Sequence, residues 1–111
     1  LNPDIEMEYS DGTHTYRFAL ECKYRSSTTK TGAIDWATDE QILRYKKFEQ
    51  DKGMKVYVAI GIGGTPDKPE QVYFSPLKNL VYGVSKESYL ANFKRDMASP
   101  FYYNTTSKTL R

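Results

Sequence analysis

Residues 3–24 read PDIEMEYSDGTHTYRFALECKY, and this stretch decides how the rest of the chain can fold. Apolar and acidic side chains alternate over residues 4–9, and a second alternating run covers residues 15–24. Alternation of period two is typical of β-strands that turn one face toward a core. Asp11 and Gly12 lie between the two runs, and Asp-Gly is a strong signal for a tight hairpin turn. We therefore expect an antiparallel hairpin.

The hairpin is expected to have an apolar face and a polar face. The apolar face, expected to pack into the core, consists of Ile5, Met7, Tyr9, Tyr16, Phe18, Leu20, Cys22 and Tyr24. The polar face consists of Asp4, Glu6, Glu8, Arg17, Ala19, Glu21 and Lys23. Because Asp11-Gly12 is taken as a two-residue turn, Tyr9 should lie opposite His14.

The sequence pattern of residues 25–111 predicts a mixed sheet covered by helices. Thr38 and Gln41 have the spacing of a capping box, and Ile42, Tyr45 and Phe48 mark the apolar face of the helix that follows. The elements expected after the hairpin are a loop at 25–37, a helix from Thr38 to Gly53, strands at 55–62 and 71–75, a helix at 85–95 with Tyr89, Leu90 and Phe93 inward, and an irregular tail from Ser99.

This order, β-β-α-β-β-α, predicts an α/β (α+β) fold with a mixed sheet and flanking helices. The central strand, helix and strand should form a right-handed parallel crossover. The 111 residues fit a single domain, 1–111, with a modest core.

Composition narrows the class of protein. The net charge is only +2, so a nucleic-acid partner would have to be recognised by the placement of charges rather than by their excess. Cys22 is the single cysteine, which excludes a disulfide within the chain and fits a reducing compartment. No apolar run approaches the length of a membrane span and no signal peptide is visible, so we expect a cytoplasmic protein.

The polar face of the hairpin carries the chemistry. With a two-residue turn, Asp4 lies opposite Ala19, and Glu21 is its diagonal neighbour about 7–8 Å away. Two carboxylates at that separation can hold one cation, and Lys23 lies on the same face. Phosphodiester hydrolysis uses a hard cation to polarise the phosphate and lower the pKa of a water, and a nearby ammonium to stabilise charge. The arrangement therefore predicts Mg²⁺- (or Mn²⁺-) dependent hydrolysis of nucleic acid, and we expect DNA in preference to RNA.

Pro3-Asp4 followed by Glu21-Cys22-Lys23 resembles the PD-(D/E)xK signature of restriction-endonuclease-like nucleases. The resemblance implies that Asp4 and Glu21 bind the metal. It also implies that the backbone carbonyl of Cys22 is a ligand and that Lys23 assists the attacking water.

The resemblance extends beyond this signature, over roughly residues 2–80. Gln41-Ile42-Leu43-Arg44-Tyr45 is similar to the Q-x-x-x-Y element of several branches, which implies that Gln41 and Tyr45 assist catalysis. The β-β-α-β order also matches the family core. That core begins with a helix before the PD strand, for which this sequence has no room, so we expect a fragment or excised domain of a longer chain.

Basic residues near the expected site offer two readings. Arg25, Lys30, Arg44 and Lys47 line a nucleic-acid groove in one reading and are solvated loop and helix positions in the other. Similarly, the charged hairpin face is either a catalytic cluster or a solvated sheet face with cross-strand ion pairs, and we favour the cluster.

Three further features have simpler interpretations. We expect His14 to be an exposed residue beside the turn and not a general base. Cys22 is expected in the core, and Trp36 is expected to pack rather than stack on a base. The glycines at 61–64 follow a strand, but no Lys-Ser/Thr or helix start comes after them, so we expect a turn and not a phosphate loop.

Two functions follow from these observations. The first is metal-dependent hydrolysis of nucleic acid, endo- or exonucleolytic. The alternative is a catalytically inactive nuclease-fold module for nucleic-acid or protein binding within a larger protein. Enzymes with this fold often cut duplexes as dimers, so a homodimer is also compatible with the resemblance.

Overall fold

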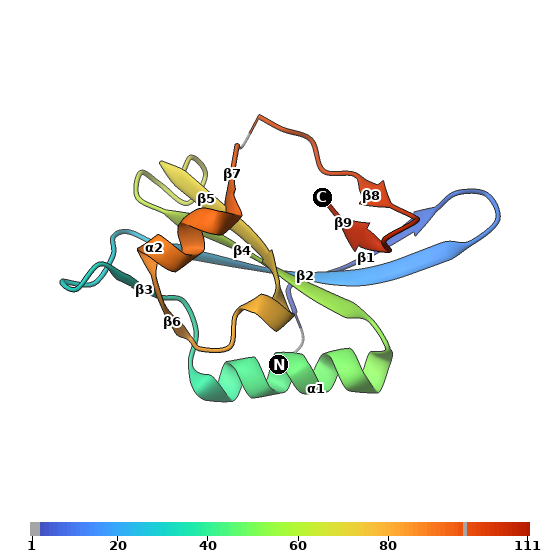
Figure 1. Ribbon diagram of the computed structural model, residues 1–111, viewed down its shortest axis with the longest axis horizontal. Helices are drawn as coiled ribbons and strands as arrows, with labels where there is room; N and C mark the ends of the chain where they lie inside the picture. Colours follow the sequence, from blue (N-terminus) through green and yellow to red (C-terminus); the bar gives the residue numbers. More distant parts are fainter. Residues whose placement is uncertain (1–2, 97) are drawn as a thin grey trace.

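The computed structural model describes residues 3–96 and 98–111, and it has an α+β fold built on a mixed five-stranded sheet (Figure 1). The strands of this sheet lie in the order β1 (Ile5–Ser10), β2 (Thr15–Arg25), β4 (Lys55–Ile62), β5 (Gln71–Pro76) and β7 (Lys94–Arg95). Two small sheets pair β3 (Ala33–Asp35) with β6 (Val84–Lys86) and β8 (Tyr103–Asn104) with β9 (Thr109–Leu110). The helices are α1 (Asp39–Lys52) and α2 (Glu87–Leu90), with 3₁₀ turns at Leu77–Asn79 and Ala91–Phe93.

Helix α1 connects β2 to β4 as a crossover, and the two strands are parallel, as predicted. Both ends of the helix follow from local sequence. Thr38 forms a capping box with Gln41, and Gly53 ends the helix in the left-handed conformation, where its N–H donates to the Glu49 carbonyl. The predicted apolar positions Ile42, Tyr45 and Phe48 are all buried.

The core lies between α1 and one face of the sheet. Ala19 on β2 and the β-branched residues of β4 form that face, and all of them are buried. Trp36 has no exposed surface, and its indole N–H donates to the Tyr82 carbonyl at 3.1 Å. The prediction that Trp36 packs rather than stacks on a base is confirmed.

The predicted hairpin register is wrong by two residues. Tyr9 lies opposite Tyr16 rather than His14, and Ser10 lies opposite Thr15. The cause is the turn: Asp11 Oδ1 accepts hydrogen bonds from the N–H groups of Thr13 and His14, which gives a connection longer than two residues. A slip of two residues leaves every side chain on its predicted face, because the period of a strand is two.

The apolar face of the hairpin is not the core, contrary to the prediction. Ile5, Met7 and Tyr9 are exposed, and so is Cys22. The reason is the position of α1, which covers the face containing Ala19 and Glu21. On the opposite face, Tyr103 of the C-terminal segment stacks on Phe18 with ring centroids 5.6 Å apart, and the Tyr24 hydroxyl donates to the Gly64 carbonyl of the β4–β5 loop.

Three other predictions need correction. The loop at 25–37 contains β3, and the tail contains the β8–β9 hairpin. The helix predicted at 85–95 is only α2 followed by a 3₁₀ turn and β7. Leu90 is buried as expected and Phe93 packs partly against the core, but Tyr89 is exposed. No helix among the described residues is long and apolar enough to cross a lipid bilayer.

The segment before α2 docks tightly on the residues that precede α1. The Gly83 carbonyl accepts hydrogen bonds from the N–H groups of Trp36 and Ala37. A Cβ added at Gly83 would overlap the backbone carbonyl of Ala37. This close approach requires glycine.

We expect Gly83→Ala to lower the free energy of unfolding by about 3 kcal/mol, because the added methyl overlaps backbone rather than a movable side chain. Urea denaturation provides the measurement. The control is Gly12→Ala at an open position with a φ of 90°, where only strain of about 1–2 kcal/mol is expected. A smaller loss at Gly83 than at Gly12 would contradict the docking.

Candidate active site

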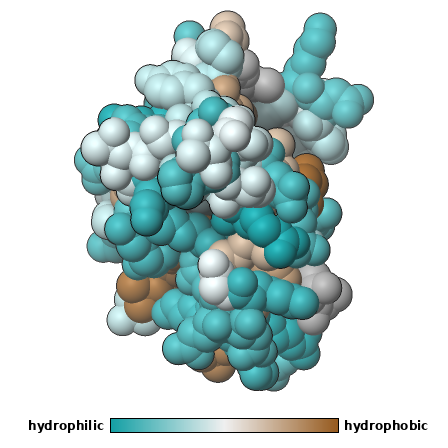
Figure 2. All heavy atoms as spheres, turned by 90° about the vertical axis from the view of Figure 1, so that its right-hand side faces the viewer, coloured by the Kyte–Doolittle hydropathy of each residue, from teal (hydrophilic) through white to brown (hydrophobic). Residues whose placement is uncertain are grey.

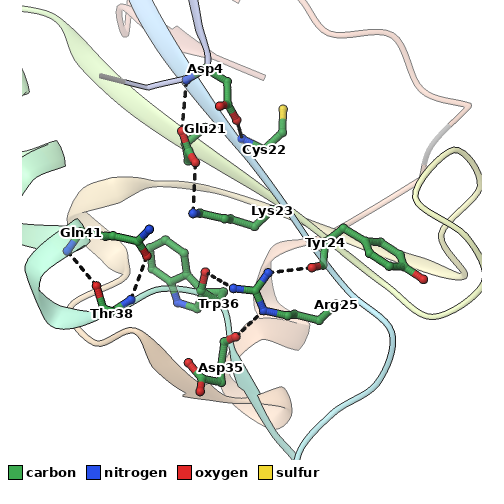
Figure 3. Close-up of polar contacts among 10 residues, drawn as sticks. All are labelled: Asp4, Glu21, Cys22, Lys23, Tyr24, Arg25, Asp35, Trp36, Thr38 and Gln41. Carbon is green, nitrogen blue, oxygen red and sulfur yellow. Dashed lines mark hydrogen bonds and ion pairs between the residues drawn. The ribbon is translucent and has the colours of Figure 1, made fainter. Parts of the chain in front are cut away.

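Glu21 is a buried carboxylate between the central sheet and helix α1. Strand β2 turns it toward α1, and only 5% of its surface is exposed. A buried carboxylate needs partners, since an unpaired charge in a protein interior is strongly unfavourable. Glu21 Oε1 accepts a hydrogen bond from the Asp4 N–H at 3.1 Å, and Oε2 lies 3.3 Å from Lys23 Nζ (Figure 3).

Asp4 lies beside Glu21 at the point where β1 begins. Its carboxylate Oδ2 accepts a hydrogen bond from the Cys22 N–H at 2.9 Å. Continuing the observed register sets Asp4 directly opposite Glu21, rather than diagonal to it as predicted. These two hydrogen bonds place Asp4 beside Glu21 and Cys22.

Pro3 lies just before β1, and proline has no N–H to donate to a strand ladder. In an extended strand the N–H and C=O of one residue point to the same side, so the Cys22 carbonyl points to the side of the Cys22 N–H, which is bonded to the Asp4 carboxylate. The Cys22 carbonyl is therefore directed toward the start of β1, beside Asp4.

Lys23 and Tyr45 complete the cluster from β2 and α1. The Lys23 side chain is 14% exposed, and its Nζ lies 5.9 Å from the centre of the Tyr45 ring. Burial, a hydrogen bond with Glu21 and the negative charge of Glu21 raise the pKa of Tyr45 well above its ordinary value. Tyr45 is therefore a neutral hydroxyl at physiological pH, held against the Glu21 carboxylate.

Gln41 lies on the same helix but has a different use. Its side-chain Oε1 accepts a hydrogen bond from the Thr38 N–H at 3.0 Å, and its own N–H donates to Thr38 Oγ1 at 3.1 Å. Both bonds belong to the helix cap. Tyr45 thus lies beside the acidic cluster. The side-chain amide oxygen of Gln41 is instead bonded to the Thr38 N–H at the start of the helix.

Three of the four residues predicted to bind nucleic acid have partners within the protein. Arg25 donates to three backbone carbonyls, those of Tyr24, Asp35 and Trp36, at 2.7, 2.7 and 3.0 Å. Arg44 pairs with Glu40 at 3.8 Å, and Lys47 pairs with Asp51 at 2.9 Å, both along α1. Lys30 is an exposed loop residue. Arg25 is accordingly a clamp between β2 and the segment before α1.

The donor set suits a hard cation. The carboxylates of Asp4 and Glu21 and the carbonyl of Cys22 are oxygen ligands, which Mg²⁺ and Mn²⁺ prefer. The described residues contain no group of three His, Cys, Asp or Glu side chains placed to hold a metal. Mg²⁺ usually takes only one or two protein carboxylates and keeps several waters, so the pair with one carbonyl fits that ion.

Other nucleophiles near the cluster are poorly suited to catalysis. Partial burial and the negative charges of Asp4 and Glu21 raise the pKa of the Cys22 thiol, which keeps it protonated at neutral pH. His14 is exposed beside the hairpin turn, as predicted.

Sequence reasoning missed two backbone features of this site. The Asp4 N–H binds Glu21, and the Cys22 N–H binds the Asp4 carboxylate. Both contacts depend on the register, which the assumed turn displaced by two residues.

Comparisons with protein-family models, with curated proteins and with solved structures gave no match to this chain. The function must therefore be argued from the geometry of the site.

We expect Gln41→Ala to lower the free energy of unfolding by about 1 kcal/mol, because it removes half of the capping box. Gln41→Glu keeps the side-chain acceptor, since Glu is equally suited to this position. The measurement is urea denaturation of both variants beside the unmodified protein. Equal stability of Gln41→Ala and the unmodified protein would show that the side chain does not serve the cap.

Proposed function

We propose that this protein is a metal-dependent nuclease that hydrolyses phosphodiester bonds in nucleic acid, DNA in preference to RNA. The observation that carries the proposal is the contact of the buried Glu21 carboxylate with the Lys23 ammonium and with the backbone N–H of Asp4, whose own carboxylate accepts the Cys22 N–H. The order of β1, β2, α1 and β4 supports a restriction-endonuclease-like core, in which these residues occupy the positions of the PD-(D/E)xK signature.

The proposed metal ligands are Asp4, Glu21 and the carbonyl of Cys22. A divalent cation bound there would polarise the scissile phosphate and lower the pKa of an attacking water. The protein contributes the positions of the ligands. The Asp4 N–H fixes one oxygen of Glu21, and the Cys22 N–H fixes one oxygen of Asp4, so that neither carboxylate rotates freely.

Lys23 is proposed to hold the attacking water or a phosphate oxygen. Strand β2 points Lys23 to the same side as Glu21, and the packing of Tyr45 beside its ammonium limits its motion. A preorganised positive charge in a partly water-excluded site stabilises the charge that develops on a phosphate. Tyr45 supports this arrangement by holding the Glu21 carboxylate from the helix side.

A second candidate is a nuclease-fold module that binds nucleic acid or protein without cutting. The observation in its favour is that the polar atoms of the cluster already satisfy one another: Lys23 and the Asp4 N–H engage both oxygens of Glu21. An inactive module would use this network only to stabilise β2. Metal binding distinguishes the two candidates.

We expect the protein to bind Mn²⁺ at one site that is lost in Asp4→Asn and in Glu21→Gln, because both carboxylates are proposed ligands. Isothermal titration calorimetry measures this binding. Glu6→Gln is the matched control, since Glu6 lies on the same face of β1 but opposite Ala19. Equal binding by all variants, or none by the unmodified protein, would contradict the proposed site.

We expect Lys23→Ala to reduce cleavage of plasmid and oligonucleotide DNA with Mg²⁺ or Mn²⁺ by about 10²–10³-fold. The reason is the loss of one charge aimed at the phosphate. The measurement is the initial rate of cleavage at saturating metal.

One further variant makes the cleavage test decisive. Lys23→Arg keeps a positive charge beside Glu21, so it should fold even if Lys23→Ala does not, and it should retain more activity than Lys23→Ala. Circular dichroism monitors folding. Absence of cleavage of single- and double-stranded DNA and RNA by the full-length protein with either metal would favour the non-catalytic module.

A further inference from the structure

We propose that the end of the molecule around the start of β4 is a second binding surface for nucleic acid, separate from the acidic cluster. We call it the lysine surface, and it is defined by Lys55, Lys78 and Lys108. That its polyanion is a nucleic acid rests on the proposed function.

The three lysines surround two adjoining hollows. The first, of about 250 Å³, is lined by Lys55 and Lys108 together with the aromatic rings of Tyr16, Tyr57 and Tyr103. The second, of about 180 Å³, is lined by Lys55 and Lys78. Lys55 thus belongs to both hollows, and positive charges stand on either side of it.

These lysines carry charge that the protein does not neutralise. In the described part of the chain, the basic residues that form ion pairs with carboxylates are Arg17, Lys23, Arg44 and Lys47. None of them involves the lysine surface. Lys55 Nζ donates only to the backbone carbonyl of Lys108, at 3.0 Å. Glu49 of α1 borders the second hollow, but its carboxylate accepts the backbone N–H of Val56 at the start of β4, at 2.8 Å.

Aromatic rings stand next to these charges. Tyr103 stacks on Tyr9 with centroids 5.5 Å apart and lies 5.0 Å from Tyr16, so three tyrosines from two hairpins form one wall. Tyr9 and Tyr16 keep part of their surface exposed. Rings beside cations are the combination that binds single strands, in which unpaired bases stack while phosphates meet lysines.

The character of this end of the molecule favours nucleic acid over a protein partner. Figure 2 looks onto the end formed by the β1–β2 turn, the end of α1 and the β8–β9 hairpin. Hydrophilic residues cover most of it, and hydrophobic residues appear only as separate spots. A stable protein interface has an apolar core depleted of charge, which this end lacks.

The lysine surface lies away from the acidic cluster. Lys55 is opposite Phe18 and Val58 is opposite Glu21, so the two sites are three residues apart along the strands, or roughly 10 Å. They are also on opposite faces of the sheet, because Phe18 and Glu21 differ in parity along β2. A strand held at the lysine surface is therefore bound outside the catalytic cluster.

The test is fluorescence anisotropy of a labelled oligothymidylate in EDTA, where no metal-dependent cleavage occurs. We expect Lys55→Glu/Lys108→Glu to weaken binding at least tenfold. The slope of log K against log salt should become shallower by roughly 1.4, at about 0.7 per lost phosphate contact on a single strand. An abasic oligomer of the same charge should bind the unmodified protein about tenfold more weakly, since base stacking is lost.

The control is the double variant Lys68→Glu/Lys94→Glu, which changes the net charge by the same amount. Lys68 is an exposed lysine of the β4–β5 loop, and Lys94 is an exposed lysine of β7. This control should bind within about twofold of the unmodified protein. Equal loss in both double variants would overturn the proposal, as would binding of the abasic oligomer with unchanged affinity. Because the measurement needs neither metal nor cleavage, its failure is distinguishable from failure of the nuclease activity, which Asp4 and Glu21 variants test.

Discussion

A carboxylate buried between a sheet and a helix must be satisfied on every side, and Glu21 imposes this constraint on the structure around it. One oxygen requires the Asp4 N–H, which ties the start of β1 to the middle of β2. The other requires Lys23. Tyr45 on α1 lies beside this pair, with its ring centre 5.9 Å from Lys23 Nζ. The position of this one group thus links three elements that are far apart in the sequence.

Arg25 imposes a similar constraint one step further along β2. Its guanidinium collects three carbonyls and so fixes the path of the chain into α1. Trp36 in turn donates hydrogen bonds to the carbonyls of Tyr82 and Gly83, which ties this path to the segment before α2. The rigidity of the cluster therefore depends on neighbours that have no part in binding a ligand. A basic residue near a candidate site is as easily a backbone clamp as a phosphate contact.

The sequence was sufficient to predict the parts of this fold that depend on local periodicity. The capped helix, the β4 strand and the crossover between β2 and β4 are examples, since each follows from the order and spacing of residues along consecutive segments. The hairpin register was not predictable, because the Asp11 carboxylate binds two backbone N–H groups and lengthens the turn. The orientation of the hairpin was not predictable either: both faces of β2 contain apolar residues, and only the position of α1 decides which is buried. In the candidate site, the proximity of Asp4, Glu21 and Lys23 and the capping role of Gln41 were predictable from local spacing, whereas the use of Arg25 depended on contacts with the distant carbonyls of Asp35 and Trp36.

Strand β1 is at the edge of the sheet, and its acidic residues have a consequence for self-association. An edge strand presents unpaired backbone groups on which a second copy can add. If two copies pair their β1 strands about a two-fold axis, the two sheets become continuous and each side chain meets one from the same face of the other copy. Even-numbered residues of β1 then meet even-numbered residues. Glu6 and Glu8 would then face Glu6, Glu8 or Asp4 of the other copy in every central register. Like charges directly opposite each other destabilise a strand pair. The acids that surround the candidate site therefore also protect its open edge from pairing with itself, and a homodimer would have to use a different surface.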